Sequence, residues 1–205
     1  MNVFVMPVGA LATNCYLVWD DKKNAVVIDP GDEAERILTE ARARDLTIHT
    51  VLLTHLHYDH YLGVPGIVAA TGARLIIPKE EEPAVTDDGR TFIDSIPAER
   101  RFRLQPDELV DEGDTVTVGD LTFTVWRTPG HSAGSSCYLC EDALFSGDTL
   151  FAGTIGRADP PSGSEEDMHN SLMRLAAYPE NPRVFPGHGE ATTLEIERRF
   201  NPFMK

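Results

Sequence analysis

Residues 54–60 read T-H-L-H-Y-D-H and follow the apolar run at residues 51–53, which is typical of a buried strand. This stretch holds three of the seven histidines of the chain, together with an aspartate. Imidazoles crowded in this way repel one another when they are protonated, and they contribute nothing to packing. Histidine nitrogens and carboxylate oxygens are instead the ligands that zinc and similar divalent metals take from proteins. The stretch therefore predicts a metal site at the end of a strand.

The spacing within this stretch indicates more than one metal position. His55 and His57 are two residues apart, so they lie on the same side of an extended backbone. Asp59 and His60 are adjacent, and we expect them to diverge, with one of them directed at a second position. A catalytic zinc takes at least three protein ligands and keeps one position for water. Two metals therefore need further ligands from elsewhere in the chain.

Three later segments have the form expected of loops that supply those ligands. They are T-P-G-H at residues 128–131, S-G-D-T at residues 146–149 and P-G-H-G at residues 186–189. Each follows a strand-like run and places glycine beside its candidate ligand, which lets the backbone turn sharply at a strand end. The candidate ligands are His131, Asp148 and His188.

Alternating apolar and polar runs indicate strands in both halves of the chain. The first thirty residues alternate β-rich runs with polar turns, as in a meander of strands. Residues 32–45 show the apolar spacing of an amphipathic helix, and residues 164–178 indicate another, with its first residue, a serine, as the cap. We expect a solvated helix and loop over residues 79–100 and a strand at 101–105. This order predicts a mixed α/β or α+β protein and is compatible with two sheets between flanking helices.

Size and charge exclude several classes of protein. With 205 residues and 41% hydrophobic content the chain can bury a proper core, and we expect one domain over residues 1–205. The net charge of -15 comes without any Lys/Arg cluster, which argues against a nucleic-acid partner. The N-terminus lacks a positively charged segment and is interrupted by Pro7 and Gly9, so we expect neither a signal peptide nor a membrane span. A cytoplasmic protein without a membrane partner is the expectation.

The three cysteines are an odd number at irregular spacing, which argues against a disulfide framework. Cys137 and Cys140 form a C-x-x-C, but they lie in a strand-like run, where residues three apart face opposite sides. We expect both to be buried as small apolar side chains. His49 and His169 lie outside the motifs above and are expected to be ordinary surface or core residues.

The order H-x-H-x-D-H, then a distant histidine, an aspartate and a last histidine resembles the signature of the metallo-β-lactamase fold superfamily. The resemblance covers nearly the whole chain. It implies an αββα sandwich, in which two mixed β-sheets are flanked by helices and the metals lie at one edge. It also implies a role for each ligand: His55, His57 and His131 bind the first metal, Asp59, His60 and His188 bind the second, and Asp148 bridges the two.

Within that superfamily the chain is most similar to the glyoxalase II group, the hydroxyacylglutathione hydrolases, and particularly to its single-domain bacterial relatives. The similar stretches are T-N-C-Y-L-V at residues 13–18, V-V-I-D-P-G at 26–31, S-G-D-T-L-F-A-G and I-G-R at 146–157, and the ending from residue 187 onward. The resemblance implies hydrolysis of a thioester such as S-lactoylglutathione. The additional C-terminal helical domain of full-length glyoxalase II, which helps to hold glutathione, is not expected in this chain.

The departures from the glyoxalase II pattern bear on the substrate rather than on the metals. Leu62 stands where the first glycine of a Gly-Gly pair is usual, and Ala158 replaces a residue with a hydroxyl group. Arg157 occupies the place of a basic residue that contacts glutathione, so the resemblance implies that it binds substrate. An ion pair between Arg157 and Asp159 or Glu165 is the alternative role.

The implied chemistry is hydrolysis by metal-activated water. Two divalent ions, zinc first and iron or manganese as alternatives, would lie roughly 3.5–4 Å apart and lower the pKa of a shared water to about 7. The metal-bridged hydroxide would attack the thioester carbonyl, and Asp59 would orient it. A thiol, with a pKa of about 8.5, leaves with little acid assistance. Thr54, Thr128 or Ser132 is expected to fix the ligands, and Tyr58 either faces the substrate or packs beneath the metal loop.

Other reactions remain open on the same fold. Persulfide dioxygenases share the fold and much of the I-G-R segment but use a single iron held by two histidines and an aspartate. Hydrolases of other small esters or lactones share the H-x-H-x-D-H pattern. The full set of seven ligands favours a two-metal hydrolase, whereas the acidic balance disfavours a nuclease and the absence of an export signal disfavours an antibiotic hydrolase. The native metal, the acyl group, the thiol carrier and the oligomeric state are not fixed by the sequence.

Overall fold

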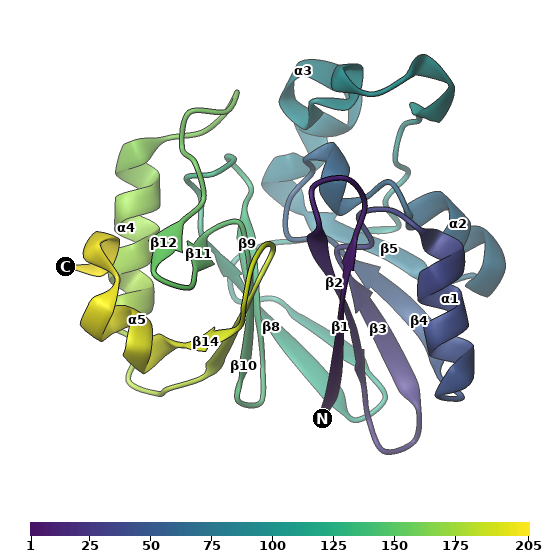
Figure 1. Ribbon diagram of the computed structural model, residues 1–205, viewed down its shortest axis with the longest axis horizontal. Helices are drawn as coiled ribbons and strands as arrows, with labels where there is room; N and C mark the ends of the chain where they lie inside the picture. The colour runs from purple at the N-terminus through teal and green to yellow at the C-terminus, as the bar shows by residue number, and fades with distance from the viewer.

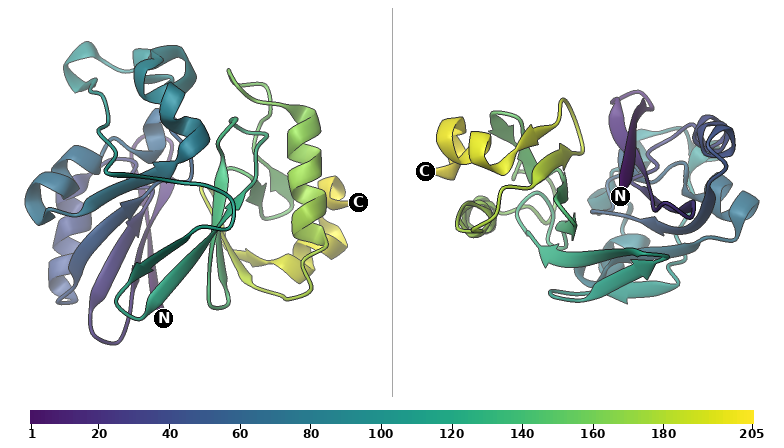
Figure 2. Two further views of the ribbon diagram at one scale, coloured as in Figure 1. Left: turned by 180° about the vertical axis from the view of Figure 1, so that it is seen from behind. Right: turned by 90° about the horizontal axis from the view of Figure 1, so that it is seen from below.

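Two six-stranded sheets face each other in the computed structural model, which describes residues 1–205, and helices cover the outer side of each sheet (Figure 1). The view from below in Figure 2 shows the helices on the outside and the sheets between them. The first sheet comes mainly from the first half of the chain and the second sheet from the second half. The αββα sandwich implied by the sequence is therefore confirmed.

The first sheet has the strand order β1-β2-β3-β4-β5-β6. These strands are β1 (Asn2–Val8), β2 (Thr13–Trp19), β3 (Asn24–Ile28), β4 (Thr47–Leu52), β5 (Arg74–Pro78) and β6 (Glu108–Val110). The first three strands are antiparallel neighbours, as the meander pattern predicts, and β3 to β6 are parallel. Helices α1 (Ala34–Ala43) and α2 (Val64–Thr71) connect β3 to β4 and β4 to β5 and cover the outer face (Figure 1).

The second sheet has the order β14-β13-β10-β9-β8-β7. These strands are β7 (Thr115–Val118), β8 (Leu121–Arg127), β9 (Ser136–Cys140), β10 (Ala143–Gly147), β13 (Arg183–Pro186) and β14 (Thr192–Thr193). Helices α4 (Glu165–Ala176) and α5 (Leu194–Phe200) cover its outer face, and β11 (Leu150–Phe151) and β12 (Thr154–Ile155) form a short hairpin beside it. The Ser164 hydroxyl accepts a hydrogen bond from the Asp167 amide at 3.1 Å, so the expected cap of α4 is confirmed. No helix has the length and apolar content to cross a membrane.

The hydrophobic core has three layers, because both faces of each sheet are covered. Residues 25–28 of β3 are fully buried and alternate between the layer beneath α1 and α2 and the layer between the sheets. A strand covered on both faces is expected to be a continuous apolar run, as this one is. Cys137 lies in the layer beneath α4 and Cys140 in the layer between the sheets. Both cysteines are free and buried, and they face opposite sides as predicted.

Four strand ends meet at one edge of the sandwich. β8, β10 and β13 run in the same direction, because β9 lies antiparallel between β8 and β10 while β10 and β13 are parallel. The end of β4 is tied to the second sheet by Tyr138, whose hydroxyl donates to the Leu53 carbonyl at 2.7 Å. The Tyr16 hydroxyl donates to the Pro186 carbonyl at 2.6 Å. The loops that follow these strands are therefore held together across the gap between the sheets.

The chain between β5 and β6, residues 79–107, is called here the β5–β6 segment, and it lies above the first sheet (Figure 1). It contains four short helices: η2 (Lys79–Thr86), α3 (Asp88–Thr91), η3 (Ile93–Ser95) and η4 (Ala98–Arg100). The expected strand at 101–105 is wrong. Phe102 instead packs edge-on against Tyr61 at 5.6 Å, and Arg101 donates hydrogen bonds to carbonyls of the same segment. Local packing thus replaces a strand partner.

Candidate metal centre

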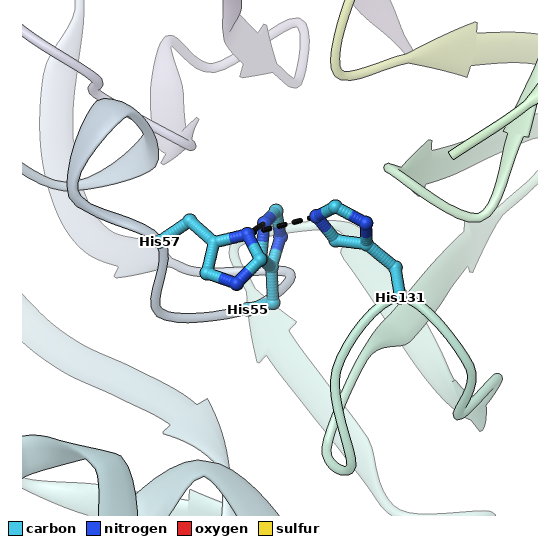
Figure 3. A group of neighbouring side chains, drawn as sticks. All are labelled: His55, His57 and His131. Carbon is cyan, nitrogen blue, oxygen red and sulfur yellow. Dashed lines mark hydrogen bonds between the residues drawn. The ribbon is translucent and has the colours of Figure 1, made fainter. Parts of the chain in front are cut away.

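Three histidines converge at the edge where these strands end (Figure 3). Figure 3 shows His55 and His57, from the loop after β4, facing His131, from the loop after β8. His55 Nε2 lies 3.1 Å and His131 Nε2 lies 2.8 Å from His57 Nδ1. All three side chains are buried. The structure therefore brings together the three residues assigned to the first metal.

A second group adjoins the first. His60 Nε2 lies 3.5 Å and His188 Nε2 lies 3.3 Å from Asp59 Oδ2. Asp148 lies between the groups, with Oδ1 at 3.4 Å from His60 Nε2 and Oδ2 at 3.4 Å from His131 Nε2. The expected divergence of Asp59 and His60 is wrong, because the 3-10 turn Tyr58–His60 brings both side chains to the same group.

The outer nitrogens of the histidines fix the direction of their lone pairs. His131 Nδ1 donates to the Arg157 carbonyl at 2.7 Å, and His60 Nδ1 donates to Asp29 Oδ2 at 3.0 Å, because both acceptors lack a proton to give. Thr54 gives its own hydroxyl proton to Asp29 at 2.7 Å, so it accepts from His55 Nδ1 at 3.1 Å. When these rings are neutral, Nε2 of all three residues therefore presents a lone pair to the centre.

Asp29 is a functional residue that the sequence interpretation missed. Its buried carboxylate accepts from the Thr54 amide at 2.8 Å and from the Thr54 hydroxyl and His60. Its backbone is left-handed, with φ of 49°, which places the carboxylate under the metal loop. The only signal was the stretch D-P-G at the end of β3, which had served as a point of resemblance and not as a contact.

We expect Asp29→Asn to weaken metal binding by roughly 10–100-fold. The carboxylate oxygens of Asp29 accept hydrogen bonds, whereas the amide nitrogen of an asparagine is itself a donor and would face the donors Thr54 and His60. Metal affinity measured by competition with a chromogenic chelator tests this expectation. Asp21→Asn, at an exposed aspartate, is the control and should leave the affinity unchanged. Equal affinities of Asp29→Asn and the wild type would show that Asp29 does not orient the ligands.

Glu81 is the second residue that was missed, since the sequence predicted a solvated segment there. Its side chain is buried, and Oε2 accepts from the Leu56 amide at 3.0 Å. Oε1 accepts from the Gly134 amide at 2.9 Å and from the Ser132 hydroxyl at 2.7 Å. Because Leu56 lies between two ligands and Ser132 follows a third, this carboxylate joins both loops of the first group. Its neighbours in the run E-E-E are exposed, so no sequence signal distinguished it.

The three residues expected to fix the ligands have different roles in the structure. Thr54 contacts His55 and Asp29, as described above. The Ser132 hydroxyl contacts Glu81 and Ser135 and forms no hydrogen bond with a ligand. Thr128 shares a hydrogen bond of 2.9 Å with Thr149 and does not contact a ligand. The expectation is therefore met by Thr54. It is wrong for Thr128, whose hydroxyl bonds to Thr149 and not to a ligand.

Burial and charge divide the centre into two halves. Burial, followed by a neighbouring imidazole, lowers the pKa of His57 to about 3. Burial and nearby imidazoles also hold the pKa of His55 well below its usual range. Although burial alone would lower it, Asp59 and Asp148 raise the pKa of His60 well above its usual range. His55 and His57 thus offer neutral nitrogens, whereas a proton and a metal ion compete for His60.

The arrangement fits two divalent metal ions. His60 Nε2 and Asp148 Oδ1 are buried, point into the centre and have no hydrogen-bond partner. Imidazole nitrogens and carboxylate oxygens are borderline ligands that suit zinc and also iron or manganese. The residues that could hold the ions form three overlapping groups: His55, His57 and His131; His55, His60 and Asp148; and Asp59, His60 and His188. This donor set supports a metal-dependent enzyme.

Arg157, the predicted substrate-binding residue, contacts the centre with its backbone and not with its side chain. Its carbonyl binds His131, while its side chain is 76% exposed and pairs with Asp159 at 2.6 Å. The ion pair is the alternative role that the sequence allowed, and contact with substrate stays a prediction. His49 lies outside the centre, with Nε2 at 3.0 Å from Asn24 Oδ1.

Known proteins resemble this chain in sequence and in structure. Residues 8–188 match the metallo-beta-lactamase superfamily. Hydroxyacylglutathione hydrolase GloC of Haemophilus influenzae is 34% identical over 215 residues, which cover 100% of this chain and 98% of that protein. The crystal structure of BLEG-1, described as a B3 metallo-beta-lactamase, matches with a TM-score of 0.92 at 33% identity over 100% of both chains. The di-iron-bound form of TTHA1623 matches with a TM-score of 0.86 at 35% identity and covers 98% of this chain and 100% of that one. The chain therefore belongs to the metallo-beta-lactamase superfamily.

Proposed function

We propose that the protein is a two-metal thioester hydrolase that acts on a small substrate such as S-lactoylglutathione. The observation that carries the proposal is the convergence of all seven candidate ligands in two adjoining groups, with Asp148 in contact with both. Bound divalent ions would supply an activated water and a Lewis acid for the carbonyl group. Hydrolysis is the reaction that needs only these two elements and a leaving group that departs readily.

The open side of the centre suits this reaction. The side chains of His188 and Asp59 are 28% and 13% exposed, whereas that of His60 is fully buried. A substrate therefore reaches the centre beside Asp59. Although burial alone would raise it, His60 and the hydrogen bonds from His188 and Thr13 hold the pKa of Asp59 below its usual range. An ionised Asp59 accepts a hydrogen bond from water and orients it, and it donates no proton.

The leaving group is the reason for choosing a thioester. Asp59 and His188 on the open side are assigned to a metal and not to proton donation, and a thiolate leaves with little acid assistance because the thiol pKa is about 8.5. The relative GloC is named a hydroxyacylglutathione hydrolase and has nearly the same length as this chain. A mononuclear iron oxidoreductase would need only one group of ligands, and the completeness of the second group favours the hydrolase.

Metal analysis combined with an S-lactoylglutathione assay tests the proposal. We expect about two metal ions per chain and hydrolysis that a strong chelator abolishes and added zinc, iron or manganese restores. His57→Ala should lower kcat/KM by at least roughly 100-fold, because it removes a first-group ligand. His49→Ala, outside the centre, is the control and should retain full activity.

Three results would contradict the proposal. The first is a single iron per chain with oxygen uptake on glutathione persulfide. The second is hydrolysis of a β-lactam without hydrolysis of any thioester, which the similarity to BLEG-1 makes a necessary comparison. The third is unchanged thioester hydrolysis by His57→Ala, since the reaction would then not depend on the metal centre.

A further inference from the structure

A cavity of about 240 Å³ adjoins the metal centre on the side of the first sheet. It lies between the tip of the β1–β2 hairpin, the metal loop after β4 and the end of the β5–β6 segment. Asp59, which forms part of the open side of the centre, is also part of the cavity wall. A substrate whose carbonyl lies beside Asp59 can therefore extend into this cavity.

The surface of the cavity is mainly apolar. Leu11, Leu62 and Ile96 line it together with Tyr58, whose ring also packs against the core beneath. Leu11 is 52% exposed at the hairpin tip, although leucine is usually buried. An apolar group bound in the cavity would cover side chains that the folded chain leaves open. The cavity thus provides hydrophobic stabilisation for a ligand that covers the exposed part of these side chains.

Of the three charged residues that line the cavity, Asp32, Asp59 and Arg100, two are paired with each other. Arg100 Nη2 contacts both carboxylate oxygens of Asp32, at 2.8 Å and 2.9 Å. Because the guanidinium is paired with a carboxylate and Asp59 Oδ2 contacts His60 and His188, the cavity offers no unpaired cation to an anionic acyl group. A neutral, apolar group is the ligand that matches this lining.

We propose that this cavity binds the acyl group of the thioester and that the preferred acyl groups are uncharged chains of roughly six to eight heavy atoms. The inference rests on the proposed thioester hydrolysis and deepens it. The size follows from the volume, since a water-sized group occupies about 30 Å³ and the cavity holds about 240 Å³. Longer chains would have to leave the cavity, so the preference should end at about this length.

A series of S-acyl glutathiones from acetyl to dodecanoyl tests the proposal on the metal-loaded protein. We expect kcat/KM to rise by up to about fourfold per methylene and to level off near six to eight chain atoms. Ile96→Trp should fill the cavity and move the limit to shorter chains, while Ile96→Ala should move it to longer ones. Leu11→Trp is a second filling variant if Ile96→Trp does not fold.

Ile196→Trp provides the matched control, because Ile196 is 48% exposed on α5 and does not line the cavity. It should leave the chain-length profile unchanged. Non-hydrolysable S-alkyl glutathiones, measured by calorimetry, separate the two proposals. If they bind with the same length dependence while no thioester is hydrolysed, the proposed reaction fails and the cavity assignment stands. If thioesters are hydrolysed and the profile is the same in wild type, Ile96→Trp and Ile96→Ala, the cavity assignment fails.

Discussion

Gly187→Ala is expected to lower the metal content of the protein and to reduce its hydrolytic activity by at least about 100-fold. An added Cβ would overlap Asp148 Oδ1 and lie 2.8 Å from His60 Cε1. The backbone cannot retreat, because the Gly187 amide donates to the Gly147 carbonyl at 2.8 Å and the Gly187 carbonyl accepts from the Asn14 amide at 2.7 Å. The methyl group would therefore displace Asp148, which contacts both groups, and His60 of the second group. Metal content by atomic emission and kcat/KM on a thioester measure the effect.

Gly189→Ala is the control for this prediction. Gly189 belongs to the same loop and has a φ of 79°, but no atom lies within 4 Å of an added Cβ. The control tests backbone strain, which costs about 1–2 kcal/mol of stability, without a steric conflict at the centre. We expect it to keep both metals. Equal metal content in Gly187→Ala and Gly189→Ala would contradict the packing argument.

Glu81→Gln is expected to lower both the stability of the protein and its affinity for metal. The amide oxygen can still accept from Gly134 and Ser132, but the amide nitrogen would face the Leu56 amide, donor against donor. Leaving that buried N–H group unpaired and removing the charge should cost about 3 kcal/mol of unfolding free energy. For a chain of this size the loss corresponds to roughly 6–12 °C in melting temperature. Metal affinity should fall by roughly 10–100-fold, since the loops of His55, His57 and His131 lose their common anchor.

Glu82→Gln provides a matched control, because Glu82 is the exposed neighbour of Glu81. Its melting temperature and metal affinity should equal those of the wild type. Melting of the metal-free proteins separates loss of fold from loss of ligand positioning. A Glu81→Gln protein that is destabilised but binds metal normally would restrict Glu81 to a role in stability.

The candidate ligands could be found from the sequence for a physical reason. Each lies in a short motif directly after an apolar run, and apolar alternation identifies strands without knowledge of the tertiary structure. That His131, Asp148 and His188 belong to one centre was implied by the resemblance to the superfamily signature, and the structure gives the reason, since β8, β10 and β13 run in one direction and end at one edge of the sheet. Strands and helices interspersed in both halves predicted a mixed α/β or α+β protein, and the resemblance to the superfamily implied the αββα arrangement.

Only the tertiary structure showed what holds these ligands in place. Asp29 contacts His60 across 31 residues, and Glu81 contacts Gly134 across 53 residues. Each of these contacts is one hydrogen bond between segments that are far apart in the chain. Such bonds leave no periodic pattern in a sequence. The identical neighbours of Glu81 are solvated, so residue type could not separate the buried carboxylate from the exposed ones. The stretch T-H-L-H-Y-D-H determined which atoms can bind metal, and the packing of distant segments decided their directions and the shape of the cavity beside them.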